Sequence, residues 1–176
     1  MTREPVRLAR TGVPDDGRMT VPPRDDWPKP AKQTEGGALL TDVIIATFRL
    51  NARLMEAAQD LAAHGGLTAA WWQVLGGVLD EPRSVADVGR IMGVSRQAVQ
   101  RIADLLVDRG LAEYRPNPAH RRAKLLACTE AGYWAIRQIS VAQHPWSAKL
   151  SKSVDLDELR TTLATMQALI TKLEEA

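Results

Sequence analysis

The chain has 176 residues, 45% of them hydrophobic, and its 23 basic and 21 acidic residues give a formal net charge of +2. This length and apolar content suit a single domain with an adequate core. The apolar runs are too short to span a membrane, and the N-terminus lacks the apolar core of a signal peptide, so we expect a cytoplasmic protein.

Residues 1 to 37 differ in composition from the rest of the chain. They hold six of the ten prolines, charges of both signs and few large apolar residues. Such a segment cannot bury enough surface to offset its ordering entropy, so we expect a mobile N-terminal tail. Its arginines are interpreted as solvated rather than as DNA contacts, because acidic residues balance them. Met19 offers a start site for a shorter product.

Residues 38 to 64 show the apolar spacing of a helix, with Leu40 and Ile44 on one line. A pair of glycines then ends this pattern. Thr68 is expected to cap a following helix that runs to Leu79. The sequence thus predicts two helices before residue 80.

Residues 84 to 102 predict two short helices around a tight turn. Ser84 and Ser95 are the expected N-caps, because a serine hydroxyl can accept a hydrogen bond from a backbone N–H of the first turn. Gly93 fits the left-handed backbone of the turn, and Gly89 lets the crossing helix approach closely. This pattern predicts a helix-turn-helix, whose second helix enters the major groove of duplex DNA.

The second of these helices has two different faces. Its inner side is predicted to carry Val99, Ile102, Leu105, Leu106 and Arg109, and its outer side Arg96, Gln97, Gln100, Arg101 and Asp104. Arginine can bond O6 and N7 of guanine together, and glutamine can bond N6 and N7 of adenine. The outer side is therefore a candidate surface for reading bases; a solvated helix face is the alternative.

A basic β-wing is predicted directly after the helix-turn-helix. Two strands, over 111–115 and 123–128, flank a loop that contains Arg121 and Arg122, and Lys124 follows this loop. From Arg83 to Lys124 there are nine basic and four acidic residues, so this segment is +5 and the remainder of the chain is −3. A local cation excess is what a phosphate backbone requires. A basic face kept for solubility is the alternative.

Two more helices are predicted after the wing. Thr129 is the expected cap of a helix that runs to about Gln143, with Pro145 kinking or ending it. Asp155 is the expected cap of the last helix, which carries a narrow apolar stripe of Leu156, Leu159, Leu163, Met166 and Ile170. Pairing both terminal helices across a two-fold axis covers such stripes and places two recognition helices about one DNA turn apart. We therefore expect a homodimer; terminal helices folded onto their own lobe are the alternative.

Over residues 38 to 175 the chain resembles the MarR family of bacterial winged-helix regulators. The resemblance is carried by Leu67-Thr68, Trp72, Val74-Leu75, Gly93-Val94-Ser95, Val99, Arg101, Leu105, Gly110-Leu111, Asn117-Pro118, Arg122 and Thr129-Glu130-Ala131-Gly132. It implies a dimer that binds pseudo-palindromic operators, with recognition helices in the major groove and wing arginines in the minor groove. By position, it assigns Ser95, Arg96, Gln97, Gln100 and Arg101 to the reading helix and Arg121 and Arg122 to the wing. His120 stands where the family usually has an aspartate, and a histidine cannot hold the wing arginine in the same way.

The resemblance also implies regulation by a small ligand. Similar proteins release DNA when an aromatic or phenolic compound enters a cleft between the dimerisation and DNA-binding lobes. Trp71 and Trp72, with His64 just before them, lie on the segment expected to line that cleft. Trp72 is interpreted as packing, whereas Trp71 points about 100° away on an ideal helix and is the better ligand candidate.

The remaining chemistry of the sequence is sparse. The lone Cys128 excludes an intramolecular disulfide, and its apolar neighbours predict a buried, inert thiol rather than a redox sensor. The three histidines are scattered and no nucleophile or phosphate-loop motif occurs, so we expect no enzyme activity, metal or cofactor.

The expected fold is mainly α with a small β-wing. A winged helix-turn-helix over 67–128 lies between dimerisation helices over 38–64 and 129–176. The expected function is a homodimeric regulator of transcription that binds double-stranded DNA, acts as a repressor and is released by a small aromatic effector. The alternative is a winged-helix module that binds a protein partner, and a weak dependence of DNA binding on salt would favour it.

Overall fold

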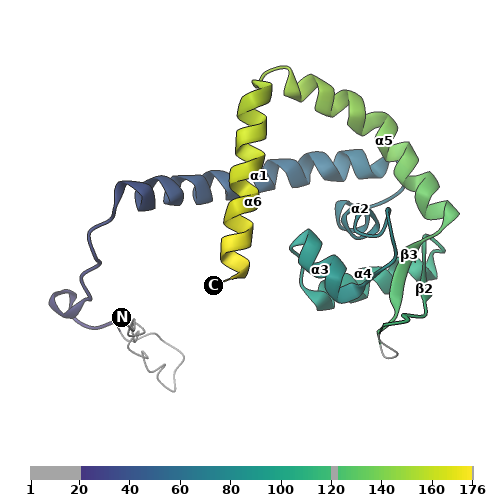
Figure 1. Cartoon of the computed structure of the whole chain (residues 1–176), viewed down its shortest axis with the longest axis horizontal. Coiled ribbons are helices and arrows are strands. Elements are labelled where there is room, and N and C mark those ends of the chain that lie inside the picture. The colour runs from purple at the N-terminus through teal and green to yellow at the C-terminus, as the bar shows by residue number, and fades with distance from the viewer. Residues whose placement is uncertain (1–20, 120–122, 176) are drawn as a thin grey trace. The chain divides into compact units, whose positions relative to one another are not determined.

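The computed structural model describes residues 21–119 and 123–175 (Figure 1). The chain divides into two units between Ile45 and Ala46. The described elements are, in order, η1 (Arg24–Asp26), α1 (Glu35–Ala63), α2 (Ala69–Gly76), β1 (Arg83–Ser84), α3 (Val85–Met92), α4 (Arg96–Asp108), β2 (Ala112–Arg115), β3 (Leu125–Cys128), α5 (Glu130–Ser151) and α6 (Leu156–Glu174). The predicted fold, mainly helical with a winged helix-turn-helix, is confirmed. None of the helices in this described part is long and apolar enough to cross a membrane.

Residues 21–34, the part before α1 that the structure describes, are exposed and carry the short helix η1. α1 begins at Glu35, where the Thr34 hydroxyl accepts a hydrogen bond from the Gly37 backbone N–H at 3.0 Å. The predicted mobile tail falls largely on residues 1–20, which lie outside the described residues.

The helix starts follow the predicted caps. The side chains of Thr68, Ser84, Ser95 and Thr129 each accept a hydrogen bond from the backbone N–H three residues later, and Asp155 accepts two. Each cap satisfies donors that have no partner inside the helix. These five helix starts are therefore fixed by interactions within one turn of the chain.

The wing belongs to a three-stranded antiparallel sheet with the order β1-β3-β2. The hairpin β2–β3 was predicted, with Arg115 opposite Leu125 next to its loop. Strand β1 was not predicted: Arg83 pairs with Leu126 across the sheet. A strand of two residues leaves no alternating pattern in a sequence, and its pairing depends on a segment some forty residues later.

The core of the larger unit lies between α2, α3, α4 and the sheet. Leu75, Val88, Val99, Leu106 and Leu126 are fully buried there. Burial of an aliphatic side chain of this size contributes about 1.5–3 kcal/mol. Figure 1 shows α3 and α4 side by side with the hairpin β2–β3 adjacent to α4.

The predicted inner side of α4 is only partly correct. Val99 and Leu106 are buried and Ile102 is half-buried, but Leu105 is 43% exposed and Arg109 is exposed as well. The core reaches α4 from one direction, and the small Ala103 occupies the remaining inward position. The buried stripe is therefore narrower than the sequence pattern indicated.

The prediction that α5 ends near Gln143 is wrong. The helix continues through Pro145 to Ser151. A proline inside a helix removes one hydrogen bond and costs about 3 kcal/mol. The intact turns on both sides are enough to carry the helix past it.

The apolar stripe of α6 is largely uncovered within the single chain. Leu156, Leu163 and Ile170 are more than half exposed, Leu159 is 38% exposed, and Met166 is half-buried. In α1, Leu40 and Ile44 are also exposed. Each of these two helices therefore presents apolar side chains that its own chain does not bury.

Candidate nucleic-acid interface

The turn between α3 and α4 places the two helices in close contact. Gly93 has a φ of 64°, in the left-handed region, and the Val94 N–H donates to the Gly89 carbonyl at 2.9 Å. A Cβ atom at Gly89 would lie only 2.7 Å from the Val94 carbonyl oxygen. Both glycines are therefore needed for this turn, as the sequence indicated.

The outer face of α4 points into solvent. The structure leaves exposed all of the polar side chains predicted for it, together with Ser95 at its start: Arg96, Gln97, Gln100, Arg101 and Asp104. Because the core lies on the opposite side of α4, this face is free to meet a partner.

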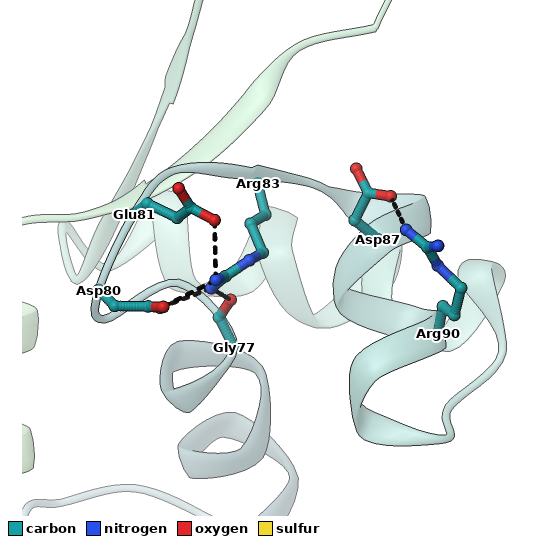
Figure 2. A network of polar contacts seen from close by, with 6 residues as sticks. All are labelled: Gly77, Asp80, Glu81, Arg83, Asp87 and Arg90. Atoms are coloured by element: carbon teal, nitrogen blue, oxygen red, sulfur yellow. Dashed lines mark hydrogen bonds and ion pairs between the residues drawn. The ribbon is translucent and has the colours of Figure 1, made fainter. Parts of the chain in front are cut away.

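Several of the basic residues counted in the sequence are neutralised by acids, and Arg83 is the most extensive case. Figure 2 shows its guanidinium contacting the Asp80 and Glu81 carboxylates and the Gly77 carbonyl. The Arg83 guanidinium lowers the pKa of Asp80 from its ordinary 3.8 to about 2, chiefly through their hydrogen bonds. This network fixes the segment between α2 and β1. Because the Arg83 charge is paired with Asp80 and Glu81, it contributes little to binding a phosphate.

Arg90 and Arg115 are neutralised in the same manner. Arg90 pairs with Asp87 on α3 (Figure 2), and Arg115 lies 2.7 Å from the Glu113 carboxylate on β2. Hydrogen bonds from Ser84 and then from Arg90 lower the pKa of Asp87. The charges of Arg90 and Arg115 are therefore partly compensated within the chain itself.

Two arginines on α4 remain uncompensated. Among the described residues, Arg96 and Arg101 form no ion pair or hydrogen bond with another side chain. Both lie on the exposed outer face. They are the cations of this face best placed to neutralise phosphates or to bond guanine.

A polar cluster links α4 to the wing. Gln100 Nε2 donates to Asp104 Oδ1 at 2.9 Å and to the Tyr114 hydroxyl at 2.8 Å, and this hydroxyl donates to Asp104 Oδ1 at 2.7 Å. Burial, and next the Asp104 carboxylate, raise the pKa of Tyr114 to about 12, so its hydroxyl keeps its proton. Lys124 Nζ lies 5.6 Å from the centre of the Tyr114 ring. Tyr114 was not among the residues predicted from the sequence, because only the sheet brings it beside α4.

This cluster forms one wall of a groove of about 640 Å³. The groove is bounded by the start of α3, the outer face of α4 and the wing, and its lining includes Ser84, Asp87, Arg96, Gln100, Tyr114 and Lys124. Of the predicted wing cations, Lys124 is thus brought next to the face of α4. His120, Arg121 and Arg122 lie outside the described residues.

The predicted effector residues are placed differently from one another. Trp71 and Trp72 are half-buried and pack against the core, whereas His64 is exposed. The Arg109 guanidinium lies 4.5 Å from the centre of the Trp71 ring, a cation–π distance that the sequence did not suggest. One face of the Trp71 ring is therefore covered by a cation.

Cys128 is buried, as predicted. Burial, followed by the charge of Glu130, raises the pKa of its thiol to about 11. A thiol is reactive only as the thiolate, so this environment is that of an inert cysteine. Within 21–119 and 123–175, no three His, Cys, Asp or Glu residues are grouped to hold a metal ion.

The sequence has relatives and a matching family model. The model that matches residues 65–123 describes the MarR family. Uncharacterized proteins of Mycobacterium tuberculosis and Mycobacterium bovis are each 36% identical over 132 residues, which cover 75% of this chain and 92% of each relative.

Solved structures share the fold. A MarR family transcription regulator matches with a TM-score of 0.65 and 24% identity over 78% of this chain and 92% of its own. The regulator MosR of M. tuberculosis in complex with DNA matches with a TM-score of 0.61 and 21% identity, over 75% and 96% of the two chains. CouR of Rhodococcus jostii bound to p-coumaroyl-CoA matches with a TM-score of 0.62 and 20% identity, over 73% and 92%.

Proposed function

The chain belongs to the MarR family of transcription regulators, whose members are not enzymes, and we propose that it binds specific sequences of duplex DNA through α4 and the wing. The observation that carries this proposal is the exposed, uncompensated pair Arg96 and Arg101 on the outer face of α4. The solved complex of MosR with DNA supports it from the shared fold. A regulator of this kind acts on the chromosome, so we place it in the cytoplasm.

The proposed contacts fall into two groups. The start and outer face of α4 enter the major groove, and the wing follows the phosphate backbone or the minor groove. The DNA-binding residues proposed are Ser95, Arg96, Gln97, Gln100 and Arg101 on α4 and Arg121, Arg122 and Lys124 on the wing.

We propose that the active form is a homodimer. Residues 38–64 and 129–176 supply the dimerisation helices, and residues 67–128 form the DNA-binding lobe. The exposed apolar side chains of α1 and α6 support this division, because association would remove them from water. The proposed dimerisation residues are Leu40, Ile44, Leu156, Leu159, Leu163, Met166 and Ile170. Two copies of α4 then meet a pseudo-palindromic operator.

We further propose that the protein represses transcription until a small aromatic effector binds. CouR, which shares the fold, is known with p-coumaroyl-CoA bound. The candidate contacts are His64, Trp71 and Trp72, with Arg109 covering the Trp71 ring. Linkage requires that the effector bind the DNA-incompetent form more tightly than the DNA-bound form.

The test is fluorescence anisotropy on duplexes that tile the DNA upstream of the gene for this protein, at several salt concentrations. We expect tight binding to one duplex, with an affinity that falls steeply as salt rises because counterions are released from phosphates. Weak binding on every duplex, insensitive to salt, would favour a winged-helix module with a protein partner.

The arginine assignment has a matched control. Arg101→Ala should reduce the slope of log affinity against log salt by about 1, if Arg101 contacts a phosphate. Arg24→Ala removes the same charge from η1, outside the proposed DNA-binding and dimerisation segments, and should leave the slope unchanged. Equal slopes for both variants and the original protein would remove Arg101 from the interface.

A further inference from the structure

The cluster of Gln100, Asp104 and Tyr114 restricts what Gln100 can offer to DNA. The amide nitrogen of glutamine carries two hydrogens, and the structure directs it at two acceptors, the Asp104 carboxylate and the Tyr114 hydroxyl. The orientation of the amide follows from Asp104, because an ionised carboxylate only accepts hydrogen bonds. The amide oxygen is the group that remains for a base.

A glutamine in this state reads bases differently from a free one. Bidentate recognition of adenine needs an N–H of the amide for N7 and the amide oxygen for the N6 amino group. While Asp104 and Tyr114 hold the amide nitrogen in this way, Gln100 presents its amide oxygen to a base. In the major groove, adenine N6 and cytosine N4 each present an amino group to such an acceptor.

We propose that Tyr114 is a specificity-determining positioning residue, which holds the Gln100 amide so that Gln100 accepts an amino group from adenine or cytosine with little preference between them. This inference rests on the proposed DNA-binding function of α4. Tyr114 contacts no base itself; it acts through Gln100.

Tyr114 is suited to this role because the sheet, and not α4, fixes its position. It lies in β2 opposite the fully buried Leu126 of β3, and its own side chain is half-buried. Lys124, in the chain that leads into β3, lies over its ring. The hydroxyl is therefore presented to α4 at a fixed point, and the wing and the recognition helix share one hydrogen-bond network.

The deciding variant is Tyr114→Phe. It keeps the ring and its packing and removes the hydroxyl, which frees one N–H of Gln100 for adenine N7. Duplexes that bind are selected from a randomised library and sequenced for the original protein, Tyr114→Phe, Gln100→Ala and Tyr133→Phe. The position that Gln100 reads is the one at which Gln100→Ala loses its base preference. Fluorescence anisotropy then compares the affinities for two duplexes that differ only in carrying adenine or cytosine at this position.

Tyr133→Phe is the matched control. It also removes one tyrosine hydroxyl, but that hydroxyl donates to the Leu79 carbonyl and not to α4. Its selected motif should equal that of the original protein. Asp104→Ala is a second test variant, since it removes the carboxylate that orients the amide and does not alter the sheet.

We expect the original protein to accept adenine and cytosine about equally at that position. Tyr114→Phe should prefer adenine by about 5- to 150-fold, the discrimination that a bidentate pair provides. If the original protein, Tyr114→Phe and Asp104→Ala select the same motif, and both variants still accept adenine and cytosine about equally, the inference is overturned. The proposed function would remain intact. A preference for adenine in Tyr133→Phe would also overturn the inference. If the original protein selects no motif, the proposed function fails and the inference fails with it.

Discussion

The tight turn between α3 and α4 predicts that Gly89→Ala destabilises the protein. The added Cβ would lie 2.7 Å from the Val94 carbonyl oxygen, whereas ordinary contacts begin at 3.4 Å. The neighbouring atom is backbone, so it cannot rotate away as a flexible side chain can. The turn between the helices has to open by several tenths of an ångström.

The size of the effect follows from two opposing terms. Overpacking of a tight contact costs about 1–3 kcal/mol. Replacement of a helical glycine by alanine returns about 0.5–1 kcal/mol. The net free energy of unfolding should therefore fall by up to about 2.5 kcal/mol. At about 2–4 °C per kcal/mol for a chain of this size, the melting temperature should drop by up to about 10 °C.

Gly76→Ala is the matched control. Gly76 ends α2, and the nearest atom to its added Cβ would be the Met92 Cε at 3.9 Å, an ordinary contact. This substitution should raise the melting temperature, because alanine lowers the entropy of the unfolded chain at a backbone conformation it can adopt. Both variants replace glycine by alanine, so they differ only in the space around the added Cβ atom.

The prediction is tested by measuring the melting temperatures of both variants. All samples are measured at one protein concentration, because dimerisation affects stability. DNA affinity should fall for Gly89→Ala, since the displaced Val94 precedes the recognition helix. A Gly89→Ala protein as stable as Gly76→Ala, with unchanged affinity, would refute the reasoning.

Three further predictions concern the oligomer, the thiol and the acid stability of the protein. Leu163→Asp should give monomers in sedimentation experiments with an unchanged circular dichroism spectrum. Leu163 is 57% exposed in the single chain, so an aspartate there should hardly lower the stability of the monomer. A dimer of normal mass would remove α6 from the dimer interface. Cys128 should react with thiol reagents at pH 8 much more slowly in the folded protein than in denaturant, since its folded pKa is about 11; equal rates would contradict its burial. The depressed pKa of Asp80 stabilises the folded state above about pH 4, and this contribution is lost as the pH falls from 3.8 toward 2. Asp80→Asn should therefore show a shallower loss of stability in that window, and an unchanged acid transition would contradict the role of the Arg83 contact.

The local features of the fold were readable in the sequence. The caps at Ser84, Ser95 and Thr129 and the left-handed turn at Gly93 lie where the residues predicted them. Each depends on interactions that span three or four residues, so the identity of the residue nearly determines the conformation. The exposure of the outer face of α4 followed from helical periodicity in the same way.

Features that depend on distant segments were not readable. Strand β1 exists only because β3 lies beside it, and α5 continues past Pro145 although local rules favour an end there. Leu105 matches the apolar pattern of α4, yet it is exposed because the core meets that helix from one direction. Such outcomes are decided by packing partners far along the chain.

The charges of the proposed interface show the same division. By itself, the sequence determined that cations concentrate between residues 83 and 124, since charge is a property of composition. Only the tertiary structure decided which cations form ion pairs with neighbouring acids and which do not. Arg83 is paired in this way, whereas Arg96 and Arg101 are exposed and can contact a partner. The tertiary structure also decided that the Gln100 amide meets a tyrosine from another element. Ion pairs and hydrogen bonds act over a few ångströms, and only folding sets those distances.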